Sequence, residues 1–179
     1  RLNELVKMGT GAIEIKSGYG LTFDAELKML RVIKRLKDNT DVTIKATFLG
    51  AHAIPKEYKD NKDGYMDLVI NEMLPKIAAE KLADYVDIFC EDGYFSVDDT
   101  KRLLKAANEF GIPSKTHVNQ FNAIGGVKAS VDLGALSVDH LEEMADEDYE
   151  ALKGSNCMPT ILPSCSFFLG IPYGPAVKM

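Results

Sequence analysis

Six short apolar segments recur along the chain, and amphipathic helical patterns separate them. The expected strands are 12–16, 43–49, 85–90, a fourth that carries His117, 135–139 and 157–162. Consecutive strands begin roughly 22 to 42 residues apart, which suits right-handed strand–helix–strand units in a parallel sheet. The strands read as apolar runs with little alternation, which predicts burial on both faces. The pattern predicts an α/β fold.

The segments between the strands carry helix signals. Thr22 is expected to cap a helix, and Pro75 lies inside a later helical pattern, where it predicts a kink or a break. Ser96 and Asp99 form an acidic variant of the capping box. Shorter helices are expected at 123–133 and 146–153, with the end of another at 2–8. The buried stripes are expected to comprise Leu27, Leu30, Ile33 and Leu36 in one helix, and Leu103, Leu104, Ala107 and Phe110 in another.

A parallel barrel fits this pattern better than a nucleotide-binding sheet, because no G-x-G-x-x-G motif opens any helix. A complete (β/α)8 TIM barrel needs about 250 residues, so 179 residues cannot close one. We therefore expect residues 1–179 to form a single barrel segment without the first and last strands. The start at Arg1 and the end at Met179 indicate an internal piece of a longer polypeptide.

Composition restricts the partners and the compartment. A formal net charge of −6 and a pI near 5.1 disfavour nucleic acid and anionic membranes as partners. No apolar run approaches the ~20 residues that span a membrane. The three cysteines, Cys90, Cys157 and Cys165, fit neither a disulfide framework nor a zinc ribbon. Free thiols in a reducing compartment are expected, and hence a cytoplasmic protein.

All three histidines, His52, His117 and His140, lie at predicted strand ends in different strand–helix units. The carboxyl ends of parallel barrel strands are where ligands and catalytic groups gather. Imidazole at such a place suits metal ligation, general acid–base work or polarisation of a substrate oxygen. The alternative is that the three rings are ordinary packed core histidines.

Other polar residues flank these histidines. Gln120 can hold a ring amide, because it donates and accepts hydrogen bonds at once. Tyr19 lies between two glycines on a loop that would present its ring. Glu91 ends a strand, and functional and structural roles are equally open for it. One of Asp139, Glu142 and Glu143 would orient the ring of His140, unless the two glutamates are solvated residues at a helix entry.

With these residues in view, the chain resembles the imidazolonepropionase family, metal-dependent hydrolases of the amidohydrolase superfamily. The resemblance rests on six short sequence blocks, given below in chain order, of which the first two are the most specific to the family. The blocks are 14–21 (EIKSGYGL), 48–53 (FLGAHA), 86–91 (VDIFCE), Lys115-x-His117-x-x-Gln120, Gly125-Gly126 and 139–142 (DHLE).

The resemblance implies a (β/α)8 barrel that binds one divalent ion, zinc or iron. His117 would be a metal ligand from the fifth barrel strand. His140, from the sixth, would contact the water that the metal activates and transfer its proton. Gln120 would contact the imidazolone ring. Tyr19 would bind the substrate propionate, and His52 would bind nearer the ring.

The implied reaction is hydrolysis of the cyclic amide 4-imidazolone-5-propanoate to N-formimidoyl-L-glutamate, in histidine degradation. The family's His-x-His pair, a substrate-binding arginine and an aspartate ligand have no counterpart in this chain, so the piece alone is expected to be inactive. The full-length protein would act on a small molecule and can form a homodimer. Two other interpretations stay open: another cyclic-amide hydrolase or deaminase of the same superfamily, and a non-catalytic barrel.

Overall fold

The computed structural model describes all 179 residues, Arg1–Met179, and is built on one parallel sheet of six strands. The strands are β1 (Ala12–Lys16), β2 (Thr43–Ala51), β3 (Tyr85–Cys90), β4 (Lys115–Val118), β5 (Ser137–His140) and β6 (Met158–Ile161). Their order in the sheet is their order in the sequence, and every neighbouring pair is parallel. The sheet curls, and the fold is an incomplete (β/α)8 barrel, as predicted.

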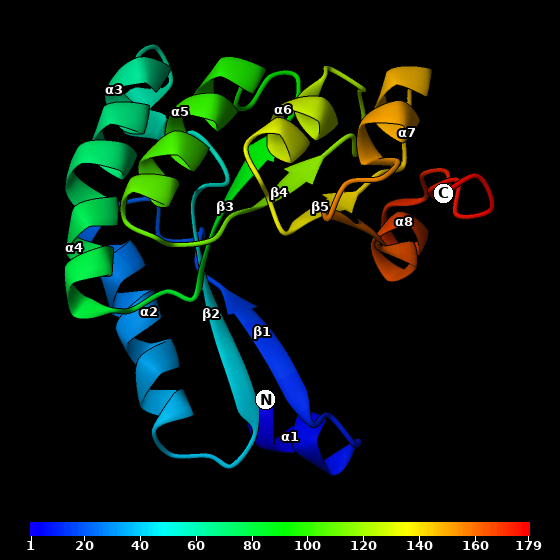
Figure 1. Cartoon of the computed structure of the whole chain (residues 1–179). Helices are drawn as coiled ribbons and strands as arrows, with labels where there is room; N and C mark the ends of the chain where they lie inside the picture. The colour runs from blue at the N-terminus through cyan, green and yellow to red at the C-terminus, as the bar shows by residue number, and fades with distance from the viewer.

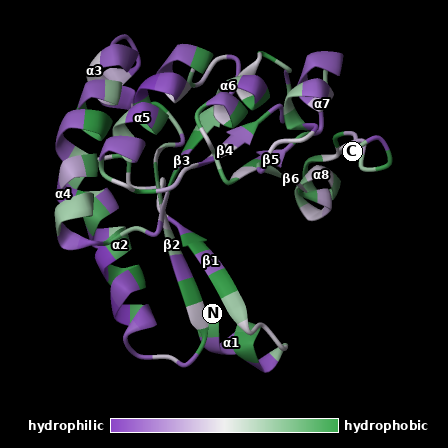
Figure 2. Cartoon of the chain, viewed as in Figure 1, coloured by the Kyte–Doolittle hydropathy of each residue, from purple (hydrophilic) through white to green (hydrophobic).

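Helices from the second to the seventh follow the strands and cover one face of the curled sheet, whereas the first helix precedes the sheet and the last lies apart from this layer, beyond the final strand (Figure 1). They are α1 (Leu2–Lys7), α2 (Phe23–Lys37), α3 (Lys62–Leu68), α4 (Leu74–Glu80), α5 (Val97–Glu109), α6 (Gly126–Asp132), α7 (Asp146–Leu152) and α8 (Pro163–Leu169), with a short 3-10 turn at Lys56–Tyr58. Figure 2 shows hydrophilic and hydrophobic residues interleaved along α2 to α5, as expected of amphipathic helices. None of the helices is both long enough and apolar enough to cross a bilayer.

The core lies between the sheet and the helices. Alternate side chains such as Ile44, Phe48, Val86, Ile88 and Val138 point to this side and belong to a cluster of 28 buried apolar residues. The opposite face of the strands, which lines the barrel interior, is polar. The prediction of apolar strands with little alternation was therefore wrong, because the interior buries charged groups that pair with one another instead of apolar side chains.

Local signals of the helices are largely confirmed. Ser96 and Asp99 form a full capping box at the start of α5, and Thr22 caps α2. Just before Pro75 the chain forms a π-helical turn, Val69–Met73, between α3 and α4. A π turn re-routes the backbone where proline removes an amide donor, so the predicted break is present as a continuous but irregular helix.

Three expectations at helix ends were wrong, and one helix was missed. Phe110 is 44% exposed, because α5 already ends at Glu109. Leu36, in the last turn of α2, is 36% exposed. The helix expected at 123–133 begins only at Gly126. α8 was not foreseen, although Pro163 at its first turn and Gly170 after its end are typical helix boundaries.

The three cysteines are free thiols, as expected. Cys90 and Cys157 are buried, and Cys165 in α8 is half-buried. Burial raises the pKa of both Cys90 and Cys157 to about 11. These two thiols therefore stay protonated at neutral pH and act as small apolar core groups.

Candidate functional site

A row of five rings crosses the carboxyl-terminal face of the sheet from the loop after β1 to the end of β5. Ring centroids lie 5.3 Å apart for Tyr19 and His52, and 6.3 Å for His52 and Phe89. They lie 6.5 Å apart for Phe89 and His117, and 5.2 Å for His117 and His140. The prediction that the three histidines lie at the ends of different strands is confirmed: His52 directly follows β2, His117 is the next-to-last residue of β4, and His140 is the last residue of β5. Phe89, which lies between two of them, was missed.

The Tyr19 loop is held from beneath by a buried glutamate. Glu26 in α2 accepts hydrogen bonds from the backbone amides of Gly18, Gly20 and Leu21 at 2.8 to 2.9 Å. At Gly18 the φ is +96°, and a Cβ there would come within 2.4 Å of the Leu49 carbonyl oxygen, so only glycine fits. The loop therefore presents Tyr19, which is 74% exposed, on a fixed backbone.

His52 is tied to the same loop. Its Nδ1 lies 3.0 Å from the Gly18 carbonyl oxygen. A carbonyl only accepts, so Nδ1 carries the proton and Nε2 is left with a lone pair. This hydrogen bond fixes the tautomer of His52 and couples its position to that of Tyr19.

His117 is oriented by a carboxylate on the neighbouring strand. Its Nδ1 lies 3.0 Å from Asp87 of β3, whose side chain is fully buried. Burial favours neutral forms, but the charges and hydrogen bonds of His117 and Lys16 outweigh it and lower the pKa of Asp87. Burial likewise lowers the pKa of His117, yet the charge of Asp87 and their hydrogen bond give a net rise. Sequence reasoning missed Asp87.

Further charged groups extend this pair across the barrel interior. Lys16 of β1 donates to Asp87 at 2.9 Å and also to Glu14. Lys115 of β4 donates to Glu14 at 2.7 Å, and its Nζ lies 3.6 Å from Asp139. The charges alternate in sign, so each buried ion has a partner of opposite sign. In the sequence, polar residues at every second position of β1, β4 and β5 were the signal that could have predicted this charged interior.

His140 reaches the interior by a strained turn. Along β5, Ser137 and Asp139 hydrogen-bond to each other on the interior side, while Val138 lies in the helix-side core. Simple alternation would place His140 on the side of Val138. Its φ of +93° breaks the alternation, and Leu141 follows with a φ of +62°. Backbone strain of this kind is concentrated at functional sites.

The surroundings keep His140 neutral at ordinary pH. Burial, and next the nearby His117, lower the pKa of His140 to about 4. The Nδ1 of His140 lies 3.4 Å from the Glu142 carboxylate, and neither atom has a hydrogen-bond partner. A neutral imidazole of this kind can accept a proton during a reaction.

Of the three carboxylates considered as partners of His140, Glu142 is the one near the ring. Asp139 is instead engaged by Ser137. Glu142 is 6% exposed and accepts from Ser166 of α8 at 2.8 Å, so the alternative of a solvated residue was wrong for it. Burial raises the pKa of Glu142.

Glu91 is a structural anchor for the loop that carries Gln120. Its carboxylate accepts from the backbone amides of Phe121 and Asn122 at 2.9 and 3.3 Å, and from the Asn122 side chain at 3.0 Å. The amide of Gln120 itself lies 3.8 Å from the Cys165 sulfur in α8. Gln120 therefore follows the carboxyl end of β4 and contacts α8.

The residues on this face suit a divalent cation. One ligand atom each from Asp87, His117 and Asp139 lies within 4.8 Å of the others. His117 offers a free Nε2, since its Nδ1 is engaged by Asp87. Neutral imidazole nitrogen and carboxylate oxygen are the donors that zinc and iron accept.

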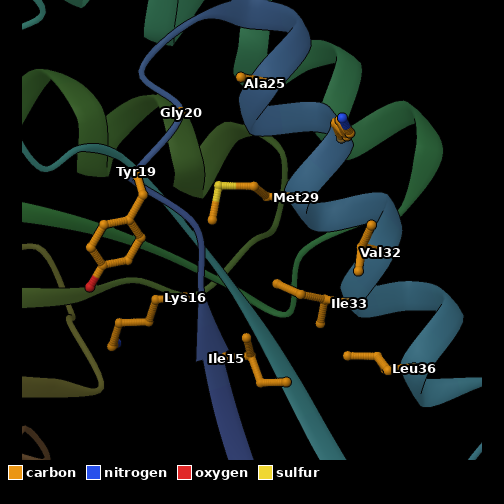
Figure 3. Close-up of a pocket in the computed structure, with 10 residues that line it drawn as sticks. Ile15, Lys16, Tyr19, Gly20, Ala25, Met29, Val32, Ile33 and Leu36 are labelled. Carbon is orange, nitrogen blue, oxygen red and sulfur yellow. The ribbon is translucent and has the colours of Figure 1, made fainter. Parts of the chain in front are cut away.

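An apolar groove of about 460 Å³ lies elsewhere, between β1 and α2. Ile15, Met29, Ile33 and Leu36 converge on it (Figure 3). Of the site residues, Tyr19 and Lys16 border it. The groove lacks any histidine or carboxylate, so it belongs to the packing of the barrel wall and not to the chemistry of the site.

The chain is similar over its whole length to curated imidazolonepropionases. It is 69% identical over 179 residues to the protein of Christiangramia forsetii, 63% to that of Flavobacterium johnsoniae and 48% to that of Shewanella piezotolerans. The chain spans 44% of the length of each of these relatives. No protein-family model matches the chain.

Solved structures with the same fold are more distant in sequence. A triazine hydrolase variant superposes with a TM-score of 0.72 at 10% identity, covering 99% of this chain and 43% of that one. The guanine deaminase from C. acetobutylicum with bound guanine superposes with a TM-score of 0.71 at 14% identity, covering 99% of this chain and 45% of that one. A mutant atrazine chlorohydrolase from Arthrobacter aurescens, complexed with zinc and atraton, superposes with a TM-score of 0.69 at 11% identity, covering 99% of this chain and 44% of that one. These likenesses establish the barrel fold.

Proposed function

We propose, because this chain corresponds over its whole length to part of the imidazolonepropionases, that the full-length protein hydrolyses 4-imidazolone-5-propanoate to N-formimidoyl-L-glutamate. The observation that carries the proposal is the identity of 48 to 69% across all 179 residues. The row of Tyr19, His52, Phe89, His117 and His140 on one face supports it, since it brings together the residues to which the proposal assigns metal binding, proton transfer and substrate contacts.

The chain's own residues have separate tasks in this proposal. His117 holds a zinc or iron ion through Nε2, and the ion, when bound, makes water nucleophilic near neutral pH and polarises the ring carbonyl. His140 accepts the proton of the attacking water and returns it to the departing ring nitrogen. His52 and Gln120 hold the imidazolone ring by hydrogen bonds. Tyr19 donates its hydroxyl to the propionate.

The isolated chain should lack this activity. It offers one histidine ligand on a barrel whose first and last strands it does not contain, and a single protein ligand does not hold a metal at working concentrations. A second candidate, the deamination or hydrolysis of another ring, draws support only from the fold of the guanine deaminase and triazine hydrolases. That candidate would not need Tyr19 and His52.

A chimera tests the proposal. This segment replaces the corresponding part of the Christiangramia forsetii imidazolonepropionase, and the loss of imidazolonepropionate is followed by absorbance with and without a chelator. We expect chelator-sensitive turnover, abolished in His117→Ala together with tight metal binding. His52→Ala is the matched control, in which metal content stays and KM rises. Metal binding without turnover of this substrate would contradict the substrate assignment.

A further inference from the structure

We infer that Asp87 and Lys16 are positioning residues that set the ring of His117 for metal binding, and that Asp87 does not itself bind the ion. This inference rests on the proposed metal-dependent function. It concerns two residues that sequence reasoning did not single out. It also means that Asp87, although it lies in the Asp87–His117–Asp139 cluster, is not one of the metal ligands.

The first step is the direction of the His117 ring. Nδ1 donates to the Asp87 carboxylate at 3.0 Å. The Asp87 side chain is fully buried, and that of His117 is 13% exposed, so water does not compete for this hydrogen bond. The bond fixes the tautomer with the proton on Nδ1, and it leaves Nε2 as the metal-binding atom. A carboxylate on the second ring nitrogen also makes the imidazole a stronger ligand.

The second step is that Asp87 is itself immobilised. Its Oδ1 also accepts the backbone amide of Ile88 at 2.8 Å, and its Oδ2 accepts from Lys16 at 2.9 Å. Lys16 is held in turn by Glu14 on its own strand. These contacts run from β1 through β3 to β4. They hold Asp87 in one rotamer, and Asp87 in turn holds the ring of His117 in one orientation.

The third step concerns the alternative in which the ion lies among Asp87, His117 and Asp139. Both carboxylates already face ammonium groups, Lys16 at 2.9 Å from Asp87 and Lys115 at 3.6 Å from Asp139. A divalent cation among them would lie close to two positive charges in a buried setting, where like charges repel strongly. In addition, the His117 atom that faces Asp87 is the protonated Nδ1, which cannot bind a metal.

The test measures metal affinity and not turnover. In the chimera, zinc affinity is determined by competition with a chromophoric chelator for the parent, Asp87→Asn and Asp87→Ala. We expect affinity to fall by about 10- to 100-fold with full stoichiometry at saturation, and the alanine variant to lose more, because an amide oxygen still accepts the Nδ1 proton. The Co²⁺ absorption spectrum should keep its band positions in both variants.

Asp84→Asn is the matched control, since Asp84 is paired with Lys37 and Lys45 but touches no histidine. Unchanged affinity in the Asp87 variants would overturn the inference, and so would an equal loss in Asp84→Asn. Loss of stoichiometric binding with a changed Co²⁺ spectrum would show Asp87 to be a direct ligand. Lys16 keeps Glu14 as a partner in Asp87→Asn, so this variant decides the question if the alanine variant does not fold. A parent chimera that binds zinc but leaves imidazolonepropionate untouched would refute the proposed substrate alone.

Discussion

Buried carboxylates fix the loops that present the candidate site. Glu26 binds three amides of the Tyr19 loop, and Glu91 binds two amides of the loop after Gln120. Asp148 of α7 accepts from the Asn119 side chain at 2.7 Å. Each carboxylate satisfies donors that would otherwise be buried without partners. At the scale of the residue, the loops of the candidate site are therefore held by acids to which the proposed mechanism assigns no step.

Replacement of Glu91 by alanine should loosen the Gln120 loop. The amides of Phe121 and Asn122 would lose their acceptor, which costs about 1 to 3 kcal/mol for buried donors. We expect a lower urea midpoint for the chimera and faster hydrogen exchange at the Phe121 amide. Asp92→Ala is the control, because Asp92 is exposed and its side chain accepts no hydrogen bond from these amides. Equal exchange rates in the two variants would argue against an anchoring role.

Sequence reasoning located the three histidines of the candidate site but not how they are held. Functional groups gather at the carboxyl ends of parallel barrel strands, and this expectation located His52, His117 and His140, because the end of a strand can be predicted from where an apolar run stops. It could not foresee that His140 turns inward through a positive φ, since local sequence does not encode a strained conformation that tertiary contacts impose. Asp87 was missed because a single acid inside a strand resembles an ordinary alternation signal until its partner on β4 is known.

At the scale of the elements, start signals were more informative than stop signals. The capping box at Ser96 is a local hydrogen-bond pattern, and the structure contains both of its bonds. The spacing of apolar residues predicted that Phe110 belongs to the buried face of α5. Such spacing does not show where a helix ends. The π turn before Pro75 keeps the apolar face of the helix continuous although the proline lacks an amide donor. The sequence predicted an irregularity near Pro75 but not that it would be a π turn.

Asp99 makes the stability of α5 dependent on pH. Burial would raise its pKa, but hydrogen bonds from Lys62 and from Ser96 outweigh burial and lower it. A carboxyl whose pKa is lower in the folded state stabilises the fold above its unfolded pKa, and this contribution is lost as the pH falls through the folded pKa. The contribution is therefore complete at neutral pH and disappears only below about pH 4.

Asp99→Asn should accordingly destabilise the chimera by about 1 to 2 kcal/mol at pH 7. The difference from the parent should shrink as the pH is lowered below about 4, as measured by urea unfolding across a pH series. Asp98→Asn serves as the control, because Asp98 lies in the same helical turn but has an 89% exposed side chain. A loss from Asp99→Asn that is independent of pH would mean that packing, and not charge, makes the capping box stable.

At the scale of the whole molecule, two open edges shape the behaviour of this chain. β1 and β6 each pair with one neighbour only, so both leave backbone donors and acceptors unpaired. Beside β1, the groove of Figure 3 leaves Val32 45% exposed. Beyond β6, Phe167 and Phe168 of α8 are 78% and 87% exposed. Apolar surface of this extent on both flanks requires cover that the chain does not supply itself.

The isolated 179-residue chain should therefore self-associate. Light scattering should give a mass that rises with concentration above the 19.7 kDa of one copy, because edge strands and the apolar groove find partners in other copies. Val32→Lys places a charge in the groove and should weaken this association. Val177→Lys, on a fully exposed residue outside the groove, should not. The same Val32→Lys change should lower the unfolding temperature of the chimera, where the completed barrel covers the groove. A monomer at all concentrations, together with an unaffected chimera, would show that this flank is an ordinary solvated surface and that the barrel closes in another way.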